Sequence, residues 1–323
     1  MAGVAKTLAH TNQSADGPLV AFAAGCVIGD VVYLHGGVSK ARSTEPCTNL
    51  YKYLASSRRW ELVNSYGPSL SHHVCVSFGD NQIIFIGGWN GKQRTSDIHI
   101  YDATANEWNK CETTGFPIGA GLSSHTANLL SNGDILVIGR EGSLRMQRRS
   151  GNAFILSGSV SKRRFEYKEY ALGVASRSGH TTSSLRSSLL IVGGRSDHLL
   201  ELHRISQKLF VETSTVAPSF QSVCAMTKPP CARKNHSATM VNDFCFVFGG
   251  ETFDGRSKEP VSELYIIDCT QNFSWKYLGN IGVGRAGHVA FLFNNGILVH
   301  GGIGEKNQVS NLTFEISLTD FST

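Results

Sequence analysis

The sequence is poor in several features that mark common classes of protein. Only 17% of its 323 residues are charged and only eight are proline. No stretch approaches the roughly 18 to 20 consecutive apolar residues of a membrane helix, and the chain does not open with a basic start followed by an apolar core. We therefore expect neither a membrane helix nor secretion, and we interpret the chain as intracellular, located in the cytoplasm, the nucleus or both.

The eight cysteines show no Cys-x-x-Cys pair and no tight cluster that would indicate a zinc site or a disulfide framework. Cys26, Cys75 and Cys245 fall within apolar runs, where a thiol behaves as a small hydrophobic side chain. This pattern is typical of a reducing compartment and predicts no metal and no cofactor.

What the chain has in quantity is glycine, with 34 residues, and these recur at regular intervals. Six apolar runs each end in glycine, and the first glycines are 51, 52, 54, 56 and 52 residues apart. The runs end at Gly36–Gly37, Gly87–Gly88, Gly139, Gly193–Gly194, Gly249–Gly250 and Gly301–Gly302. A period of this length without a helical pattern predicts a repeated four-strand unit that must stack on its neighbours.

Other residues recur in the same frame. A histidine stands thirteen or fourteen residues before the glycine in five repeats, and the first repeat has Phe22 or Ala23 there. We call these five the register histidines: His73, His125, His180, His236 and His288. In the first two repeats a tyrosine precedes a tryptophan by seven residues, giving the pairs Tyr53 with Trp60 and Tyr101 with Trp108.

This combination resembles the kelch repeat, a family whose fold is a β-propeller with one blade per repeat. Several short strings resemble a narrower group, that of kelch domain-containing protein 9: AGLSSHT at 120–126, GREG at 139–142, QRRSG at 147–151, ASRSGH at 175–180 and FGGET at 248–252. Arg140 departs from the wider pattern, which has a second glycine there, but fits the narrower group.

The repeats predict one all-β domain over residues 1–323, a six-bladed kelch-type β-propeller. The expected blades cover about 20–64, 71–112, 123–167, 178–212, 234–278 and 286–318. After Gly302 the chain has only one more good strand, at 311–318, so the sixth blade is one strand short. We expect residues 4–10 to supply that strand, because an unpaired edge there would promote association.

The sequence offers little for catalysis, and we predict no catalytic residue. Equivalent histidines on separate blades are spread around an axis and would not converge on one metal ion, so we expect each to be structural and bonded within its own blade. The resemblance also includes some propeller enzymes, among them a copper oxidase, but their ligand set is not traceable in this sequence.

A second register lies three residues before each histidine. It holds Leu70 and Leu122, then Arg177, Arg233 and Arg285, with Leu19 or Val20 in the first repeat. Equivalent positions share one height and radius, so these residues predict a rim that is half apolar and half cationic. Such a rim would suit a partner protein with an acidic or carboxylate-bearing segment. The alternative is that the arginines brace loops through backbone carbonyls.

Two segments exceed what the blades require. Residues 141–164 are basic, with Arg145, Arg148, Arg149, Lys162, Arg163 and Arg164 in and beside them. Residues 213–234 contain three prolines, which predicts an irregular loop. Loops on a rigid scaffold often carry binding residues, but nothing here stacks bases, so a nucleic-acid partner is disfavoured.

Three functions fit the sequence. The resemblance favours a non-enzymatic, monomeric interaction module that presents a propeller face to another protein. A substrate-recruiting subunit of a ubiquitin ligase is a more specific version, although we expect no added domain beside the propeller. A propeller enzyme is the third, and converging acids, bases or metal ligands around the central cavity would favour it.

Overall fold

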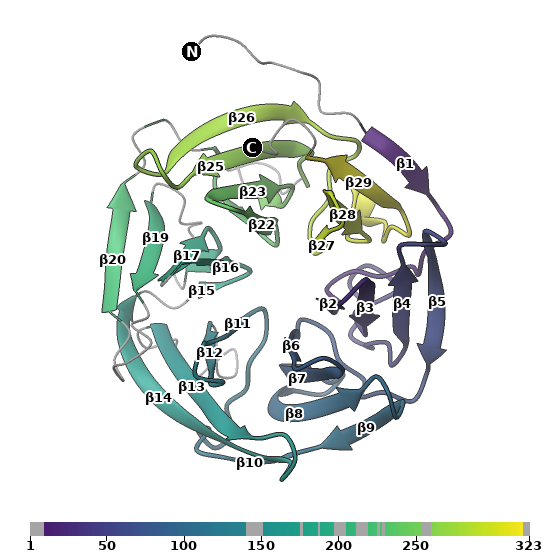
Figure 1. Ribbon diagram of the computed structural model, residues 1–323, viewed down its shortest axis with the longest axis vertical. Helices are drawn as coiled ribbons and strands as arrows, with labels where there is room; N and C mark the ends of the chain where they lie inside the picture. The colour runs from purple at the N-terminus through teal and green to yellow at the C-terminus, as the bar shows by residue number, and fades with distance from the viewer. Residues whose placement is uncertain are drawn as a thin grey trace.

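The computed structural model describes residues 10–139, 151–174, 177–186, 188–196, 205–210, 219–224, 227, 230–252 and 260–318. Within these residues the regular structure is β-strand, apart from one short 3₁₀ turn at Glu305–Asn307. The prediction of an all-β propeller is confirmed: the large sheets stand around a central axis, with β2, β6, β11, β16, β22 and β27 as their innermost strands (Figure 1). None of the described helical residues forms a helix long and apolar enough to cross a membrane.

The first three large sheets, which we call blades one to three, follow each other along the chain. Blade one contains β2 (Ala24–Ile28), β3 (Val31–His35), β4 (Leu50–Leu54) and β5 (Arg59–Asn64). Blade two contains β6 (Val74–Phe78), β7 (Gln82–Trp89), β8 (Arg94–Asp102) and β9 (Glu107–Lys110). Blade three contains β11 (Thr126–Leu129), β12 (Ile135–Ile138), β13 (Gly151–Ser159), β14 (Arg164–Val174) and, parallel to β14, β10 (Glu112–Thr114).

Blades four to six complete the circle of described sheets. Blade four contains β16 (Thr181–Leu185), β17 (Ser188–Val192), β19 (Ile205–Phe210) and β20 (Ser219–Cys224). Blade five contains β22 (Ser237–Val241), β23 (Phe244–Phe248), β25 (Glu263–Asp268) and β26 (Ser274–Asn280). Two short ladders flank them: β15 (Arg177–Ser178) with β18 (Arg195–Ser196), and β21 (Arg233–Lys234) with β24 (Glu251–Thr252).

Blade six is assembled from both ends of the chain. Its order is β1 (His10–Ser14), β29 (Thr313–Ser317), β28 (Gly296–His300) and β27 (Val289–Phe293). The purple strand β1 lies beside the yellow strand β29 in Figure 1, and the two are antiparallel with His10 opposite Ile316. The strand that joins blade six thus starts where the expected closing segment, 4–10, ends, and residues 4–9 lie outside the described part.

The two supposed excess loops contribute strands, so that part of the prediction is wrong. β13 pairs with both β12 and β14, and β20 forms the outer strand of blade four. β20 (Ser219–Cys224) contains no proline, and Pro218 and Pro229 lie outside the described residues, so proline content did not exclude a strand within this segment. Arg145, Arg148 and Arg149 lie outside the described residues, whereas Arg164 pairs with Glu112 at 3.0 Å.

The hydrophobic core lies between neighbouring blades. The second strands are continuous apolar runs, as in β7 and β23, and are buried on both faces because each blade covers the next. One cluster joins Ile84 and Ile98 of blade two to Val137 and Phe154 of blade three. No blade could bury these faces alone, so the stacking of blades is the source of stability.

Each strand ending in the glycine pair meets the following blade through its backbone. The face where the chain leaves these glycines is called the loop face, and the opposite face, with its short hairpin turns, is called the turn face. The second glycine donates its N–H to the carbonyl that stands three residues before the next histidine position. The five bonds are Gly37 to Leu70, Gly88 to Leu122, Gly194 to Arg233, Gly250 to Arg285 and Gly302 to Val20.

Glycine is required at the first position of the pair for reasons of space and conformation. Gly249 has a φ of +67°, and a Cβ there would lie 2.6 Å from the Arg285 carbonyl oxygen and 2.9 Å from Cε1 of His288. Both neighbours belong to the segment that leads into blade six. The missing side chain therefore makes room for the next register histidine.

The repeated tryptophans also connect blades. Trp60 lies opposite Tyr53 in blade one and donates its indole N–H to Thr313 Oγ1 of blade six at 2.9 Å. Trp108 lies opposite Tyr101 in blade two and donates to Asn64 Oδ1 of blade one at 3.1 Å. Each ring thus reaches back to the preceding blade.

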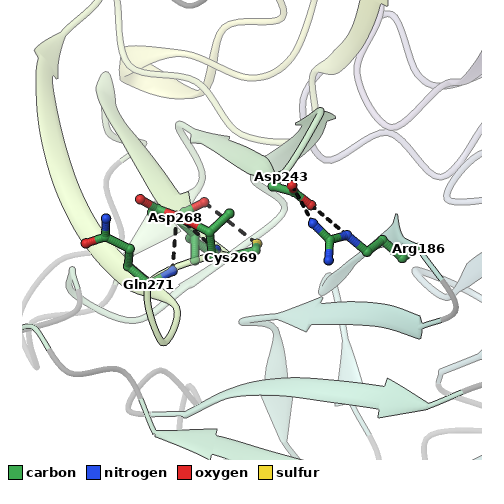
Figure 2. A network of polar contacts seen from close by, with 7 residues as sticks. Arg186, Asp243, Asp268, Cys269 and Gln271 are labelled. Carbon is green, nitrogen blue, oxygen red and sulfur yellow. Dashed lines mark hydrogen bonds and ion pairs between the residues drawn. The ribbon is translucent and has the colours of Figure 1, made fainter. Parts of the chain in front are cut away.

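On the turn face, blades four and five are joined by an ion pair (Figure 2). Arg186 donates from Nε and Nη2 to the two carboxylate oxygens of Asp243 at 3.1 and 2.7 Å. Close by, Asp268 Oδ1 accepts from the backbone N–H of Gln271, which stabilises the turn between β25 and β26. Because Arg186 is largely exposed, this pair contributes little to stability.

We expect Gly249→Ala to destabilise the protein far more than Gly29→Ala. Both glycines have a positive φ, which alone costs an alanine about 1 kcal/mol, but a Cβ at Gly29 would meet nothing within 4 Å. At Gly249 the clash with the next blade should add about 1–3 kcal/mol. Urea unfolding of both variants measures the difference, and equal losses would contradict the spacing argument.

Candidate functional site

A circle of backbone hydrogen bonds surrounds the central axis. The residue just before each register histidine, and its counterpart in blade one, donates its N–H to the carbonyl of the equivalent residue in the preceding blade. The six members, which we call the axial ring, are Phe22, His72, Ser124, Gly179, Asn235 and Gly287. The bonds are 2.7–2.9 Å long, and the one from Phe22 N–H to the Gly287 carbonyl joins blade one to blade six.

All six members have a left-handed backbone, with φ from 53° to 66°. This conformation turns each N–H toward the preceding blade and each side chain, where there is one, toward the axis. Phe22 holds the ring position in blade one, so Ala23 is the counterpart of the register histidines. Its methyl group leaves the first repeat without an imidazole.

The axial ring surrounds a cavity of about 220 Å³ at the loop face, which we call the axial cavity. The Phe22 ring stacks on the His72 ring with centroids 4.1 Å apart. It also lies against Gly287, where any side chain would collide with it. A second cavity of about 250 Å³ follows deeper along the axis, lined by the innermost strands of all six blades.

The electrostatics of the axial cavity are set by burial and by nearby cations. Burial, together with the positive charges of Arg94 and Lys234, lowers the pKa of His72 to about 4. Lys234 forms an ion pair with Glu251 at 2.8 Å. His72 is therefore neutral at pH 7, and its ring can donate one hydrogen bond and accept another.

The register histidines are structural, but the prediction that each bonds within its own blade is wrong. Their Nε2 atoms reach across to the preceding blade, because the first glycine of that blade leaves space for the ring. The contacts are His73 with His35 Nδ1 (3.0 Å), His180 with Thr126 (3.1 Å), His236 with Thr181 (3.0 Å) and His288 with Ser237 (2.9 Å). In blade two the position equivalent to Thr126, Thr181 and Ser237 is Val74, which offers no hydroxyl to His125.

Burial keeps these imidazoles neutral. It lowers the pKa of His125 and His236 to about 3, and it holds the pKa of His73, His180 and His288 well below the usual value. Across the described ranges, no group of three or more histidine, cysteine, aspartate or glutamate side chains is placed to hold a metal ion. The histidines thus serve as neutral links between blades.

The residues expected to form a mixed rim are buried instead. Their counterpart in blade one, Val20, is also buried, and the exposed fraction is at most 4% for all six: Val20, Leu70, Leu122, Arg177, Arg233 and Arg285. Each arginine donates from Nη1 to the carbonyl of the first glycine of its own blade: Arg177 to Gly193 (3.3 Å), Arg233 to Gly249 (2.9 Å) and Arg285 to Gly301 (3.1 Å). These contacts match the alternative interpretation of the sequence, in which the arginines brace loops through backbone carbonyls.

The three arginines differ in how well they are neutralised. Arg233 pairs with Glu263 at 2.7 Å and lies over the Tyr265 ring. Arg285 lies over the Phe314 ring, 4.9 Å from its centroid. Among the residues that the structure describes, Arg177 has neither type of contact, and its buried Nε and Nη2 atoms have no hydrogen-bond partner there. Burial lowers the pKa of Arg177 to about 10, although the group stays charged at pH 7.

The second register does not form an exposed rim. The position three before the histidine points into the blade, whereas the position one before it points into the axial cavity. Gly179, Asn235 and Gly287 gave a usable signal, because glycine and asparagine tolerate a positive φ better than other residues. Phe22 and His72 carry no such signal.

Comparison with known proteins agrees with this geometry. The family model of the KLHDC2/KLHL20/DRC7 Kelch-repeats domain matches residues 6–153 and 174–322. Kelch domain-containing protein 9 of Mus musculus is 29% identical over 86% of this chain and 86% of its own length, and that of Homo sapiens is 29% identical over 90% and 88%. The predicted resemblance to that group is confirmed.

A solved structure shows the same fold. The structure of YjhT aligns with a TM-score of 0.76 and 17% identity, over 94% of this chain and 96% of that one. At this identity the likeness concerns the fold alone.

We expect stability to fall steeply on acidification. Burial lowers the pKa of nine histidines in the described part of the chain: His35, His72, His73, His99, His125, His180, His236, His288 and His300. Above the ordinary histidine pKa of 6.5, these histidines are neutral in both the folded and the unfolded protein, so the full stability is present. Below that pH only the unfolded protein binds protons at these histidines, and the folded protein is destabilised. Each histidine then lowers the free energy of unfolding by up to about 1.4 kcal/mol per pH unit.

Urea unfolding at a series of pH values from about 7.5 to 5.5 measures this loss. As a control, His236→Gln should lower stability at neutral pH yet reduce the pH slope by about one proton. If the unfolding free energy hardly changed with pH below 6.5, the conclusion that these histidines are neutral in the folded protein would be wrong.

We expect Arg233→Met to cost about 3–5 kcal/mol of unfolding free energy, because it leaves Glu263 without its buried partner. Arg177→Met should cost only about 1 kcal/mol, since among the described residues it breaks one hydrogen bond, to the Gly193 carbonyl, and no ion pair. Thermal unfolding of both variants tests the comparison. The reverse order would show that Arg177 is better neutralised than its contacts indicate.

Proposed function

The chain belongs to the kelch-repeat family, and from that membership and the geometry of the axial cavity we propose that it binds a partner protein on its loop face. Kelch-repeat propellers typically serve as protein-interaction modules and are generally not enzymes. The observation that carries the proposal is the axial cavity, to which all six blades contribute residues. A rigid, preformed concave site of this kind lowers the entropic cost of binding.

The composition of the axial cavity supports binding more than catalysis. Its lining offers one aromatic ring, neutral imidazoles, the Ser124 hydroxyl and the Asn235 amide, and it contains no carboxylate. A general acid–base mechanism would need a proton donor or acceptor with a pKa near 7, and the pKa of His72 lies far below that. Phe22 and Asn235 instead suit an apolar anchor and a hydrogen-bonding group of a partner.

The partner's recognised segment carries an acidic side chain or a terminal carboxylate in this proposal. Arg94 and Lys234 both act on His72 with positive charge, so a negative group entering the axial cavity is stabilised. Neutral His72 can donate a hydrogen bond to it. This charge preference comes from Arg94 and Lys234, and not from the buried arginines of the second register.

No specific observation favours the more specialised alternatives. Recruitment of substrates to a ubiquitin ligase would need a second surface for the ligase, and no contact in the described structure singles one out. A propeller enzyme would need converging acids, bases or metal ligands, and the axial cavity brings together none of the carboxylates of the described chain. The interaction module is therefore the function that we propose.

Affinity capture from cells with the Phe22→Ala/His72→Ala variant tests the proposal. We expect the affinity of this variant for the partner to fall by a factor of about 30 or more, because both side chains line the axial cavity and such anchors contribute about 2 kcal/mol or more to binding. The matched control is Arg186→Ala on the turn face, which should retain the partner.

Urea unfolding must show that both proteins are folded. Retention of the partner by the double variant, or its loss from Arg186→Ala alone, would refute the loop face as the binding surface.

A further inference from the structure

Two cysteines meet where the innermost strands of blades one and two lie side by side. Cys26 belongs to β2 and Cys75 to β6, and these strands are neighbours around the axis (Figure 1). Both cysteines are free and partly exposed. They also pack against one hydrophobic cluster, which contains Phe85 and Tyr101 of blade two. We call them the inner thiol pair.

The repeat fixes the direction of these two side chains. Cys75 lies two residues after its register histidine, and Cys26 lies three residues after Ala23, the counterpart of the register histidines in blade one. Successive side chains of a strand point to opposite faces of the sheet, so one of these positions faces the preceding blade and the other faces the following blade. The residues two after the register position line the deeper cavity of about 250 Å³, and they are Gly25, Cys75, Ala127, Thr182, Ala238 and Ala290.

Contacts at other junctions show which residues meet. Thr182 of blade four, two after the register position, donates from Oγ1 to Oδ1 of Asn128 of blade three, three after it. Gly25 and Phe291 repeat this relation between blades one and six, where a Cβ on the glycine would lie 2.6 Å from Cζ of the phenylalanine. The residue two after the register position thus reaches the residue three after it in the preceding blade.

At the junction of blades one and two, both of these positions hold cysteine. Cys26 is hydrogen-bonded to the Cys75 thiol, and this contact, together with burial, raises the pKa of Cys75 well above its usual value. At the other five junctions neither position holds cysteine. Two sulfur atoms within hydrogen-bond reach need only a small shift to form a disulfide of about 2.05 Å.

A small molecule has a route to the inner thiol pair. The deeper cavity adjoins the axial cavity at the loop face, and Ala23, His73 and Val74 line both. Its volume of about 250 Å³ exceeds the roughly 30 Å³ that one water molecule occupies in the liquid. Cys75 lines this cavity, so a molecule as small as hydrogen peroxide can approach the pair from the axis.

We propose that Cys26 and Cys75 form a peroxide-sensitive pair that closes into a reversible disulfide between β2 and β6. The oxidant is hydrogen peroxide, and a dithiol reopens the bond. The disulfide joins the strands that follow Phe22 and His72, whose rings stack in the axial cavity. This inference is independent of the proposed function, because it requires no partner protein.

The reaction has two steps. Because its pKa is raised, Cys75 keeps its proton at neutral pH, so the first attack falls to Cys26. The Cys26 sulfur loses its proton and attacks one oxygen of the peroxide; the O–O bond breaks, the other oxygen leaves as water with that proton, and Cys26 becomes a sulfenic acid. The Cys75 sulfur then attacks the Cys26 sulfur, the S–O bond breaks, and the hydroxyl leaves as water with the Cys75 proton. Two thiols are oxidised and one peroxide is reduced to two waters.

Peptide mass spectrometry of the purified full-length chain tests this inference. The protein is treated with hydrogen peroxide, its remaining thiols are blocked with N-ethylmaleimide, and it is digested without reductant. We expect a peptide that links Cys26 to Cys75, lighter by ~2 Da than its two parts together, and its loss after treatment with dithiothreitol. Cys231→Ser is the matched control, because Cys231 is the exposed cysteine of the described chain, and this variant should form the same linked peptide.

Two further variants test the order of attack. In Cys75→Ser, the sulfenic acid on Cys26 has no thiol to close on, so it should react with dimedone. In Cys26→Ser, we expect at least about ten-fold less dimedone adduct on Cys75, since a thiol that keeps its proton is a poor nucleophile. Thermal unfolding of the reduced variants shows whether they are folded, and the measurement on the wild-type chain does not depend on them.

The outcomes that would overturn the proposal are specific. One is the recovery of both Cys26 and Cys75 as blocked thiols after peroxide has oxidised the exposed Cys231. Another is a disulfide from either residue to a different cysteine in place of this pair. A dimedone adduct on Cys75 as strong as that on Cys26 would overturn the proposed order of attack.

Discussion

The architecture depends on one circle of six backbone hydrogen bonds around the axis. Each bond joins equivalent residues of adjacent blades, and the bond from Phe22 to Gly287 closes the circle between blades that are far apart in sequence. Because these hydrogen bonds use only backbone groups, they do not depend on which side chains occupy these positions. Four of the six positions, Phe22, His72, Ser124 and Asn235, can therefore present different chemistry to the same axial cavity.

Around this circle, the glycine pairs and the register histidines pack against each other at every junction between blades. A side chain on the first glycine would occupy the space that the next histidine needs, and the histidine ring in turn reaches a hydroxyl or imidazole of the preceding blade. The histidines must stay neutral to fit, since a buried charge without a partner is costly. The close spacing of adjacent blades therefore makes the stability of the fold depend on pH.

The fold was largely predictable from the sequence, and the site was not. Spacing of glycines and histidines reports strands and their repetition, because these features are local to each repeat. The partner of His236 is Thr181, which lies 55 residues away in the preceding blade, and a periodic pattern does not say which blade a side chain faces. Likewise, spacing placed Arg177, Arg233 and Arg285 at one height without showing that they point inward. The contact between Cys26 and Cys75 also joins two separate repeats, which no single stretch of sequence records.

The pairing of β1 with β29 also decides how the molecule responds to tethers. The strands are antiparallel, so His10 and Ile316 lie at the same end of the pair, and β29 runs from the loop face to the turn face. His10 and Ser317, the outer residues of the two strands, consequently both lie toward the turn face. A pulling force applied between these two residues would therefore open the pair from that end, one hydrogen bond at a time, on the side of the molecule opposite the axial cavity.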